Sequence, residues 1–329
     1  MPAMLALAPI TAFLVALAVV QLLLSPWARG FALDRPNERS LHGTPVPRTG
    51  GLAIAAGIAA ACAIHAPGLW VTLGVAAALS AASLADDLLG LPSLVRLALH
   101  LAGAGAVVAL ELHYAEPVLF MAFLLAIAWM ANLYNFMDGT DGLAGGMTVI
   151  GFGAYALAAY AAGLASLAVL CAAVAAAAAA FLISNFDPAR IFMGDVGSVP
   201  LGFLAGALGL WGWSRGGWPI WFPLLVFAPF ICDASLTLLR RVLRRERVWQ
   251  AHREHYYQRL VRMGFGHRGT ALIEYGVMAA CAVTALGARR EPAMVQAVVL
   301  AAAAAVLITI AVWVDLRWAR FLRQGGAPA

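Results

Sequence analysis

The stretch that decides the fold runs from Leu164 to Ile183 and reads LASLAVLCAAVAAAAAAFLI. It carries no charge, and the segment 171–180 is nearly all alanine. The hydrocarbon core of a bilayer is about 30 Å thick, and a helix of about 20 apolar residues crosses it. Small residues allow helices to pack closely in lipid. The stretch therefore predicts a transmembrane helix within a bundle of helices.

Apolar runs of this kind recur along all 329 residues. Charged residues make up 11% of the sequence, whereas soluble proteins average about 25%. Backbone polar groups in lipid must be satisfied within a helix or a closed barrel, so we expect an all-α integral membrane protein without sheet. No linker divides the chain, which predicts a single domain over residues 1–329. The predicted spans number about eleven: 4–26, 50–66, 68–85, 95–112, 117–135, 143–162, 164–183, 199–213, 219–238, 271–288 and 292–314.

The arginines predict how these spans are oriented. All 21 basic residues are arginine, and no lysine is present. With the N-terminus outside, the inner-facing segments hold 18 arginines, and the outer segments hold only Arg215, Arg289 and Arg290. Basic residues concentrate in cytoplasmic loops. The sequence therefore predicts an external N-terminus and a cytoplasmic C-terminus.

Composition argues against two other kinds of function. The net charge of +5 could indicate nucleic-acid binding, but the basic residues are segregated between apolar runs, so we expect no nucleic acid as a partner. The four cysteines each lie alone in an apolar run and form no CxxC pair. Neither a disulfide framework nor a cysteine metal site is expected.

Polar residues collect at the ends of spans that this orientation places on the cytoplasmic side. Asp86 and Asp87 end the third span, and the segment Asn132–Gly142 ends the fifth. The seventh span leads to the segment Phe192–Ser198, and a basic loop after the ninth contains His252–Leu260. An active site on the cytoplasmic face is therefore predicted.

Each of these motifs has a simpler structural interpretation. Paired aspartates often cap a helix, but Asp86 and Asp87 follow a helix at its C-terminal end, where the macrodipole disfavours anions. Asp138 and Asp141 each precede a glycine and could form turns. A histidine in an exposed loop is common. The convergence of all these motifs on one face favours a functional site.

A cluster of carboxylates on one face is stabilised by a hard cation. Mg²⁺ takes oxygen ligands, usually one or two carboxylates together with substrate phosphates and water, and Mn²⁺ is the alternative ion. Arginine and histidine nearby would hold further phosphate charge. The position at the inner membrane surface suits one lipid substrate and one cytosolic, nucleotide-linked substrate.

At this point the sequence resembles the polyprenyl-phosphate N-acetylhexosamine-1-phosphate transferases, glycosyltransferase family 4. This family includes the phospho-N-acetylmuramoyl-pentapeptide transferase of peptidoglycan synthesis and the initiating transferases of O-antigen and teichoic acid synthesis. The matching motifs, in family order, are Asp34–Gly51, the Asp86–Asp87 pair, Asn132–Gly142, Phe192–Ser198 and His252–Leu260.

The resemblance implies an enzyme of the bacterial inner membrane, so that the external N-terminus would be periplasmic. It implies transfer of a sugar 1-phosphate from a UDP-N-acetylhexosamine to undecaprenyl phosphate. UMP would leave, and a lipid-linked pyrophosphoryl sugar would form. This would be the first membrane step in the synthesis of a cell-wall or O-antigen polysaccharide.

The resemblance also implies roles for particular residues. Asp86 or Asp87 would deprotonate or position the lipid phosphate, and Phe192 would stack on uracil. The residues implied to be catalytic are Asp86, Asp87 and Asp195. Those implied to bind substrate are Asn132, Asp138, Asp141, Phe192, His252, Arg253 and His255. Those implied to hold Mg²⁺ are Asp195 and Asn135.

Several alternatives stay open at the level of sequence. Direct attack by the lipid phosphate is preferred over a covalent aspartyl intermediate. UDP-GlcNAc is the first expectation for the donor, with a 6-deoxy sugar as competitor. The segment His252–His255 replaces a run of three histidines typical of the peptidoglycan enzyme, which argues against a muramoyl-pentapeptide substrate. The sequence leaves open whether the protein forms a homodimer.

Two other classes are weighed against this interpretation. A multispan transporter would place ionisable residues near the bilayer midplane. Here most of the carboxylates lie at the predicted cytoplasmic ends of the spans, and only Asp233 is expected further inside, so transport is disfavoured. The CDP-alcohol phosphatidyltransferases expect an Asp-Gly-x-x-Ala-Arg run, whereas here Asp141-Gly142-Leu143-Ala144 is followed by Gly145.

Overall fold

The computed structural model describes residues 2–28, 30, 32–34, 45–65, 67–113, 116–247 and 252–325. Of the motif Asp34–Gly51, residues 35–44 lie outside the described residues. The other motifs singled out from the sequence are described in full.

The described chain is almost entirely helical, which confirms the predicted all-α class. Two strands of two residues, β1 (Leu33–Asp34) and β2 (Val46–Pro47), pair in antiparallel fashion between the first two helices. The prediction that the chain has no sheet is therefore wrong for this one short connecting segment. The helices are α1 (Pro2–Leu23), α2 (Gly50–Ile64), α3 (Trp70–Leu89), α4 (Ser93–Leu110), α5 (Pro117–Phe136), α6 (Leu143–Ala161), α7 (Ala165–Asn185), α8 (Asp195–Ser214), α9 (Trp221–Val226), α10 (Ala228–Leu243), α11 (Tyr256–Leu260), the π-helical turn η1 (Val261–Phe265), α12 (Gly266–Ala288) and α13 (Ala293–Arg323).

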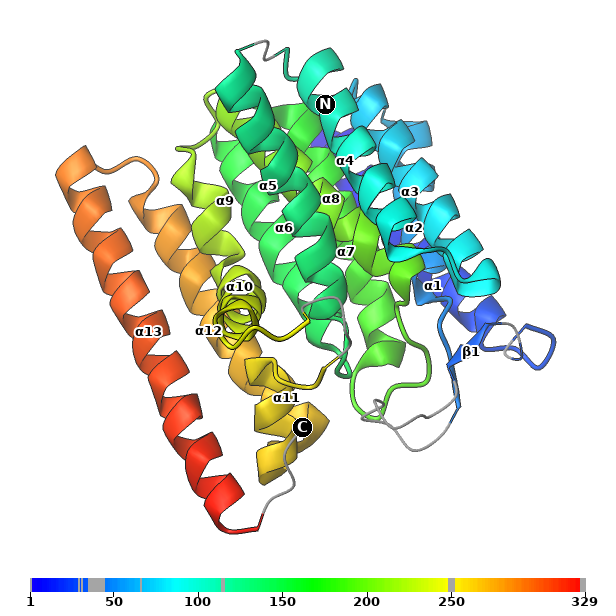
Figure 1. Ribbon diagram of the computed structural model, residues 1–329. Coiled ribbons are helices and arrows are strands. Elements are labelled where there is room, and N and C mark those ends of the chain that lie inside the picture. The colour runs from blue at the N-terminus through cyan, green and yellow to red at the C-terminus, as the bar shows by residue number, and fades with distance from the viewer. Residues whose placement is uncertain are drawn as a thin grey trace.

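Eight helical segments among the described residues are long and apolar enough to cross a membrane. They are α1, α4, α5, α6, α7, α8, the segment Tyr256–Ala288, which is kinked at Gly264, and α13. The 15-residue α2, together with α3 and the α9–α10 pair, accounts for the other predicted runs. The chain is thus a multi-pass membrane protein, and the count of eleven spans stays a prediction. In Figure 1, α1 begins at one end of the bundle and α13 ends at the other.

The ninth predicted run is broken in the middle. α9 ends at Val226, and α10 begins at Ala228 with Pro229 in its first turn. Proline lacks a backbone N–H and is tolerated only at the start of a helix, so it marks where a new helix begins. Figure 1 shows α10 nearly along its axis while α6 and α12 lie lengthwise. The break therefore turns α10 away from the direction of its neighbours.

Small residues let the central helices approach one another closely. A Cβ atom on Gly202 of α8 would overlap the carbonyl oxygen of Met130 in α5 and lie 2.6 Å from the Cβ of Tyr134. A Cβ on Gly57 of α2 would lie 2.5 Å from the carbonyl oxygen of Ala12 in α1. Helix association in lipid depends on van der Waals packing. These glycines therefore set the distances between the helices that carry the polar site.

We expect Gly202→Ala to lower the thermal stability of the purified protein, because the added methyl group meets backbone atoms of α5 that cannot move independently. Overpacking of this kind costs about 1–3 kcal/mol. The matched control is Gly153→Ala in α6, where a Cβ would find no heavy atom within 4 Å. Alanine favours a helix over glycine, so the control is expected to unfold at the same or a higher temperature. Equal melting temperatures for both variants, measured in detergent, would contradict this account.

Candidate active site

The predicted metal ligand Asp195 is the first residue of α8. The preceding residue, Gly194, has φ 70° and ψ 169°, a conformation that is essentially restricted to glycine. A Cβ on Gly194 would also overlap the carbonyl oxygen of Arg48. A carboxylate at a helix N-terminus is stabilised by the helix dipole. The backbone thus places one acidic side chain where α8 begins.

The segment that leads into α2 is fastened beside this helix start by backbone hydrogen bonds. Phe192 N–H donates to the Pro47 carbonyl at 2.8 Å, and Gly50 N–H donates to the Phe192 carbonyl at 2.9 Å. Gly51 N–H donates to the Met193 carbonyl at 2.9 Å. These bonds hold Arg48 next to Asp195, although the two residues are far apart in sequence.

An arginine approaches each oxygen of the Asp195 carboxylate. Arg48 Nη2 lies 3.6 Å from Asp195 Oδ1 and 3.1 Å from Asp87 Oδ1. Arg96 Nη1 lies 3.7 Å from Asp195 Oδ2 and 3.0 Å from Asp86 Oδ2. The Asp86–Asp87 pair is therefore joined to Asp195 through two guanidinium groups.

Neither arginine was among the predicted site residues. Arg48 belongs to the motif Asp34–Gly51, so a signal for it was present in the sequence. Arg96 lies ten residues after Asp86, in the first turn of α4. Gly90 ends α3 in a left-handed conformation, and Leu91 N–H donates to Asp86 Oδ1 at 2.6 Å. This turn brings Arg96 back toward Asp86, which sequence spacing alone does not reveal.

The two predicted asparagines, Asn132 and Asn135, lie on α5 and line the same pocket as Asp195. Asn135 Nδ2 donates to Asp195 Oδ2 at 3.3 Å, and the Ser198 hydroxyl donates to Asn135 Oδ1 at 3.1 Å. Asn132 Nδ2 donates to the Ala128 carbonyl at 2.8 Å, and its side chain also hydrogen-bonds to His100. Asn135 is therefore in direct contact with Asp195, whereas Asn132 lies one turn back along α5.

Asp195 and Asn135 together would suit a cation that takes most of its ligands from substrate and water. Among the described residues, no three His, Cys, Asp or Glu side chains lie close enough together to hold a metal ion. Asp195 and Asn135 offer one carboxylate and one amide oxygen, and Mg²⁺ commonly uses one or two protein carboxylates plus phosphate oxygens. Burial, and then the neighbouring Asp195 carboxylate, raises the pKa of Asp138 well above its ordinary value. Added positive charge here would favour the ionised carboxylates.

Two histidines of the loop after α10, His252 and His255, lie at the same pocket as Asp195. The ring centroids of His252 and His255 lie 4.9 Å apart. Burial, and then the neighbouring His255, lowers the pKa of His252 to about 4, so this ring is neutral at pH 7. Glu254 between them accepts from Arg241 at 2.6 Å. The loop is thereby anchored to α10.

A pocket of about 780 Å³ gathers most of these side chains. Its polar lining comes from helices α3, α4, α5 and α8 and from the histidine loop. Its apolar lining includes Leu94, Leu97 and Leu238. Of the predicted site residues, it collects Asp86, Asn132, Asn135, Asp195, His252 and His255.

The other five predicted site residues do not line this pocket. Asp87 is paired with Arg48, and Asp138 accepts a hydrogen bond from the Gly194 N–H. Asp141 is held elsewhere, because its carboxylate accepts from Ala189 N–H at 2.9 Å and lies 3.3 Å from His267 Nδ1. The remaining two are Phe192 and Arg253.

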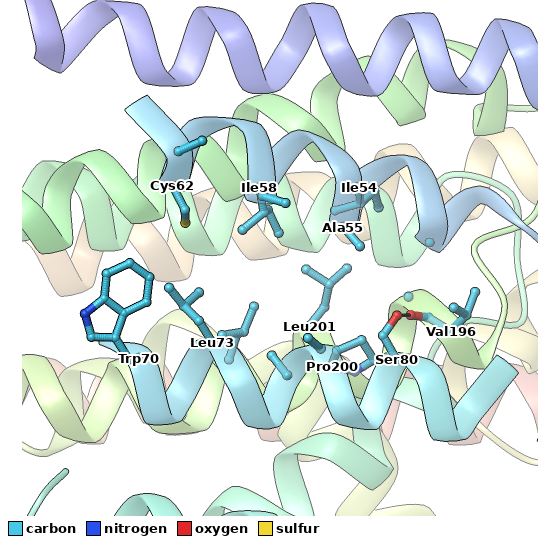
Figure 2. A pocket seen from close by; sticks show the side chains of 17 residues that line it. Ile54, Ala55, Ile58, Cys62, Trp70, Leu73, Ser80, Val196, Pro200 and Leu201 are labelled. Atoms are coloured by element: carbon cyan, nitrogen blue, oxygen red, sulfur yellow. Dashed lines mark hydrogen bonds between the residues drawn. The ribbon is translucent and has the colours of Figure 1, made fainter. Parts of the chain in front are cut away.

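A second, apolar pocket of about 380 Å³ lies between α2, α3 and α8. Figure 2 shows Ile58 and Cys62 of α2 facing Trp70 and Leu73 of α3 across it. Its lining includes Val196, the residue directly after Asp195. An apolar surface thus extends from the helix start that carries the polar site.

Sequence comparison shows which known proteins share these features. Residues 69–212 match the model of glycosyl transferase family 4. The chain is 30% identical over 293 residues to the probable undecaprenyl-phosphate N-acetylglucosaminyl 1-phosphate transferase of Bacillus subtilis, and the match covers 81% of each protein. The chain belongs to glycosyl transferase family 4.

The family membership predicted from the motifs is thereby confirmed. The decaprenyl-phosphate N-acetylglucosaminephosphotransferase of Mycobacterium tuberculosis is 28% identical over 335 aligned positions, 85% of this chain and 82% of that protein. The phospho-N-acetylmuramoyl-pentapeptide-transferase of Lactiplantibacillus plantarum is 40% identical over 82 residues, 24% of this chain and 26% of that protein. Similarity to this peptidoglycan enzyme is therefore confined to a short part of the chain.

The family model spans the helix ends that meet at Asp195, from α3 to α8. The histidine loop at residues 252–260 lies beyond the matched segment. The catalytic, substrate-binding and metal roles of individual residues in this family 4 protein stay predictions.

We expect Gly194→Ala to destabilise the protein more than Gly163→Ala does. Both glycines have positive φ, so alanine is strained at each by about 1–3 kcal/mol. Only at Gly194 would the new methyl group also overlap the backbone of Arg48, whereas Gly163 has open space around it. The melting temperatures of both variants in detergent measure the difference. A smaller loss at Gly194 would show that Arg48 is not fastened there.

Proposed function

We propose that this protein transfers N-acetylhexosamine 1-phosphate from a UDP-sugar to a polyprenyl phosphate and releases UMP. The observation that carries the proposal is the Asp195 carboxylate, flanked on each oxygen by an arginine, at the start of α8 in a family 4 protein. UDP-GlcNAc is the proposed donor, because the relatives that match most of the chain are named as N-acetylglucosamine 1-phosphate transferases. The alternative is phospho-N-acetylmuramoyl-pentapeptide transfer, named in the partial matches.

The two arginines would bind the phosphates of the two substrates. The Arg96 guanidinium is paired with two carboxylates, Asp86 and Asp195. The Arg48 guanidinium is paired with three, because Asp34 lies 4.0 Å from it in addition to Asp87 and Asp195. Phosphate is a strong bidentate acceptor for arginine. Arg96 lines the larger pocket and would bind the donor diphosphate there. Arg48, on the opposite oxygen of Asp195, would bind the acceptor phosphate.

This arrangement suits direct attack. An oxygen of the acceptor phosphate attacks the β-phosphorus of the UDP-sugar, and a new P–O bond forms. The bond from the β-phosphorus to the bridging oxygen breaks, and that oxygen leaves with UMP. Holding the two phosphates in line supplies much of the rate acceleration in such reactions. Asp86 and Asp87 would keep the two arginines apart and correctly oriented.

We propose Mg²⁺ as the cofactor, held by Asp195 and Asn135, with Mn²⁺ as the alternative ion. When bound, Mg²⁺ neutralises negative charge on the phosphate oxygens. Asn135 would contribute through its amide oxygen, which a rotation of the amide exchanges with the nitrogen now facing Asp195. Ser198 would keep the amide in place, because a hydroxyl can donate or accept.

The apolar pocket beside α8 suits the lipid chain of the acceptor. It starts at Val196 and continues along α2 and α3 to Cys62 and Trp70, with almost no polar lining. A hydrocarbon chain there would leave its phosphate on the Arg48 side of Asp195. We place the enzyme in the bacterial inner membrane with this site on the cytoplasmic side, where UDP-sugars are made available.

The direct test follows UMP release from purified protein with undecaprenyl phosphate, Mg²⁺ and a panel of UDP-sugars. UDP-GlcNAc is expected to give the highest rate, and EDTA is expected to abolish it. Asp195→Asn should lower the rate by about 10²–10³-fold while the protein stays folded, because charge stabilisation at the phosphates is lost. Asp187→Asn is the matched control, since this nearby carboxylate does not line the pocket. A rate insensitive to both EDTA and Asp195→Asn would remove the metal assignment.

A second test concerns the apolar pocket. Ala77 and Ala78 are neighbouring exposed alanines on α3, and only Ala77 lines the pocket. Ala77→Trp is expected to raise the KM for undecaprenyl phosphate several-fold and to leave the KM for the UDP-sugar unchanged, because the indole would fill space needed by the chain. Ala78→Trp should change neither. Unchanged lipid KM in both variants would place the chain elsewhere, for example beside Leu94 and Leu97.

A further inference from the structure

A buried carboxylate outside the predicted site holds the histidine loop. Asp233 of α10 is 6% exposed. Its Oδ1 atom accepts from Tyr256 N–H at 2.9 Å and lies 3.1 Å from Nδ1 of His255. The Thr237 hydroxyl donates to the same oxygen at 3.2 Å, and Tyr257 N–H donates to Oδ2 at 3.0 Å. Four groups thus surround this one side chain.

The break between α9 and α10 allows Asp233 to contact the start of α11. α10 turns away from the bundle direction after Phe227, and α11 lies in contact with it (Figure 1). Asp233 therefore reaches the start of α11, about twenty residues later in the chain. Neither the apolar pattern of the ninth run nor its polar residues indicated this contact.

The contact with Asp233 occupies Nδ1 of His255 and leaves Nε2 as the ring nitrogen that could contact a substrate. An ionised carboxylate accepts hydrogen bonds and cannot donate them, so Nδ1 of His255 must carry the hydrogen. A histidine oriented in this way presents Nε2 on the opposite side of the ring. The His255 side chain lines the larger pocket together with Asp195 and Arg96.

Aromatic neighbours hold the ring in the same orientation. The Phe136 ring is stacked on His255 with centroids 6.2 Å apart, and Tyr257 is stacked with centroids 5.8 Å apart. The Tyr257 hydroxyl donates to the Phe136 carbonyl at 3.0 Å, which ties the loop to the end of α5. Both the position and the tautomer of His255 are therefore determined by the protein.

We propose that Asp233 is a positioning residue for the transfer reaction, which presents Nε2 of His255 to the diphosphate of the bound UDP-sugar. This inference rests on the proposed function, since it names a contact to that donor. His255 would be the residue that touches substrate, and Asp233 would act only through it. His255 lines the pocket, and its Nε2 lies on the side of the ring opposite the nitrogen that contacts Asp233.

A purely structural role predicts a different pattern of effects. If Asp233 only anchored the loop, its loss would harm activity whether or not His255 were present. If Asp233 acts through His255, its loss should cost little once the imidazole is gone. A double-mutant cycle separates the two cases.

The experiment measures kcat/KM for UDP-GlcNAc in wild type, Asp233→Asn, His255→Ala and the double variant. Asparagine has one accepting oxygen in place of two, so it cannot satisfy both backbone N–H groups and Nδ1–H. We expect Asp233→Asn and His255→Ala each to lower kcat/KM by about 10- to 100-fold, as for one hydrogen bond to a charged group. The double variant should be within about threefold of His255→Ala. Thr237→Val, which removes a bond to Asp233 without touching the loop, should stay within about threefold of wild type.

Additive losses in the cycle, or no loss in His255→Ala, would overturn the proposal. A readout that does not depend on turnover is ¹⁵N NMR of histidine-labelled protein, with the His255 signals assigned by their absence in His255→Ala. Wild type should show a protonated Nδ1, and Asp233→Asn should change that signal. An unprotonated Nδ1 in wild type would overturn the proposal by itself. A wild type that shows the protonated Nδ1 but releases no UMP would instead count against the proposed function.

Discussion

The structure depends on one carboxylate held between two guanidinium groups. Asp195 is stabilised by the start of α8 and approached by Arg48 on one oxygen and Arg96 on the other. A lone charge in a membrane protein is costly, so each arginine is also paired with an aspartate of α3. The connected charges join three distant parts of the chain. The two guanidinium groups are thereby held in fixed positions beside Asp195, where the proposed function would use them to bind phosphate.

Such a network requires helices that cannot slide past one another. α5 and α8 bring Asn135 and Asp195 within 3.3 Å, and they do so because Gly202 leaves no side chain between them. Where lipid supplies no hydrophobic driving force between helices, close packing is the main source of rigidity. The alanine- and glycine-rich character of the spans is therefore tied directly to the precision of the polar site. The small residues typical of membrane helices, such as Gly202, thus also bring the polar side chains of α5 and α8 into contact.

Much of the fold was predictable, because apolar runs of about 20 residues are read from the sequence one helix at a time. Asp86, Asn135 and Asp195 were predictable as a group, since all lie at helix ends on one side. The partners of these residues were not. Arg96 reaches Asp86 only because Gly90 reverses the chain, and Asp141 lies apart because its carboxylate binds the 185–190 turn and α12. Contacts of this kind depend on the relative placement of helices, which periodicity does not encode.

A transferase that joins a lipid to a nucleotide-linked sugar has to keep two incompatible environments within a few ångströms of one reacting atom. Here α8 separates them. Its first residue, Asp195, lines the polar pocket with Arg96 and the histidines, whereas Val196, Gly197 and Pro200 line the apolar pocket. A single helix start therefore lies between a polar and an apolar pocket, the sites proposed above for the two substrates. Since neighbouring residues of one rigid helix line both pockets, the sites proposed for the two substrates lie at fixed distances from Asp195.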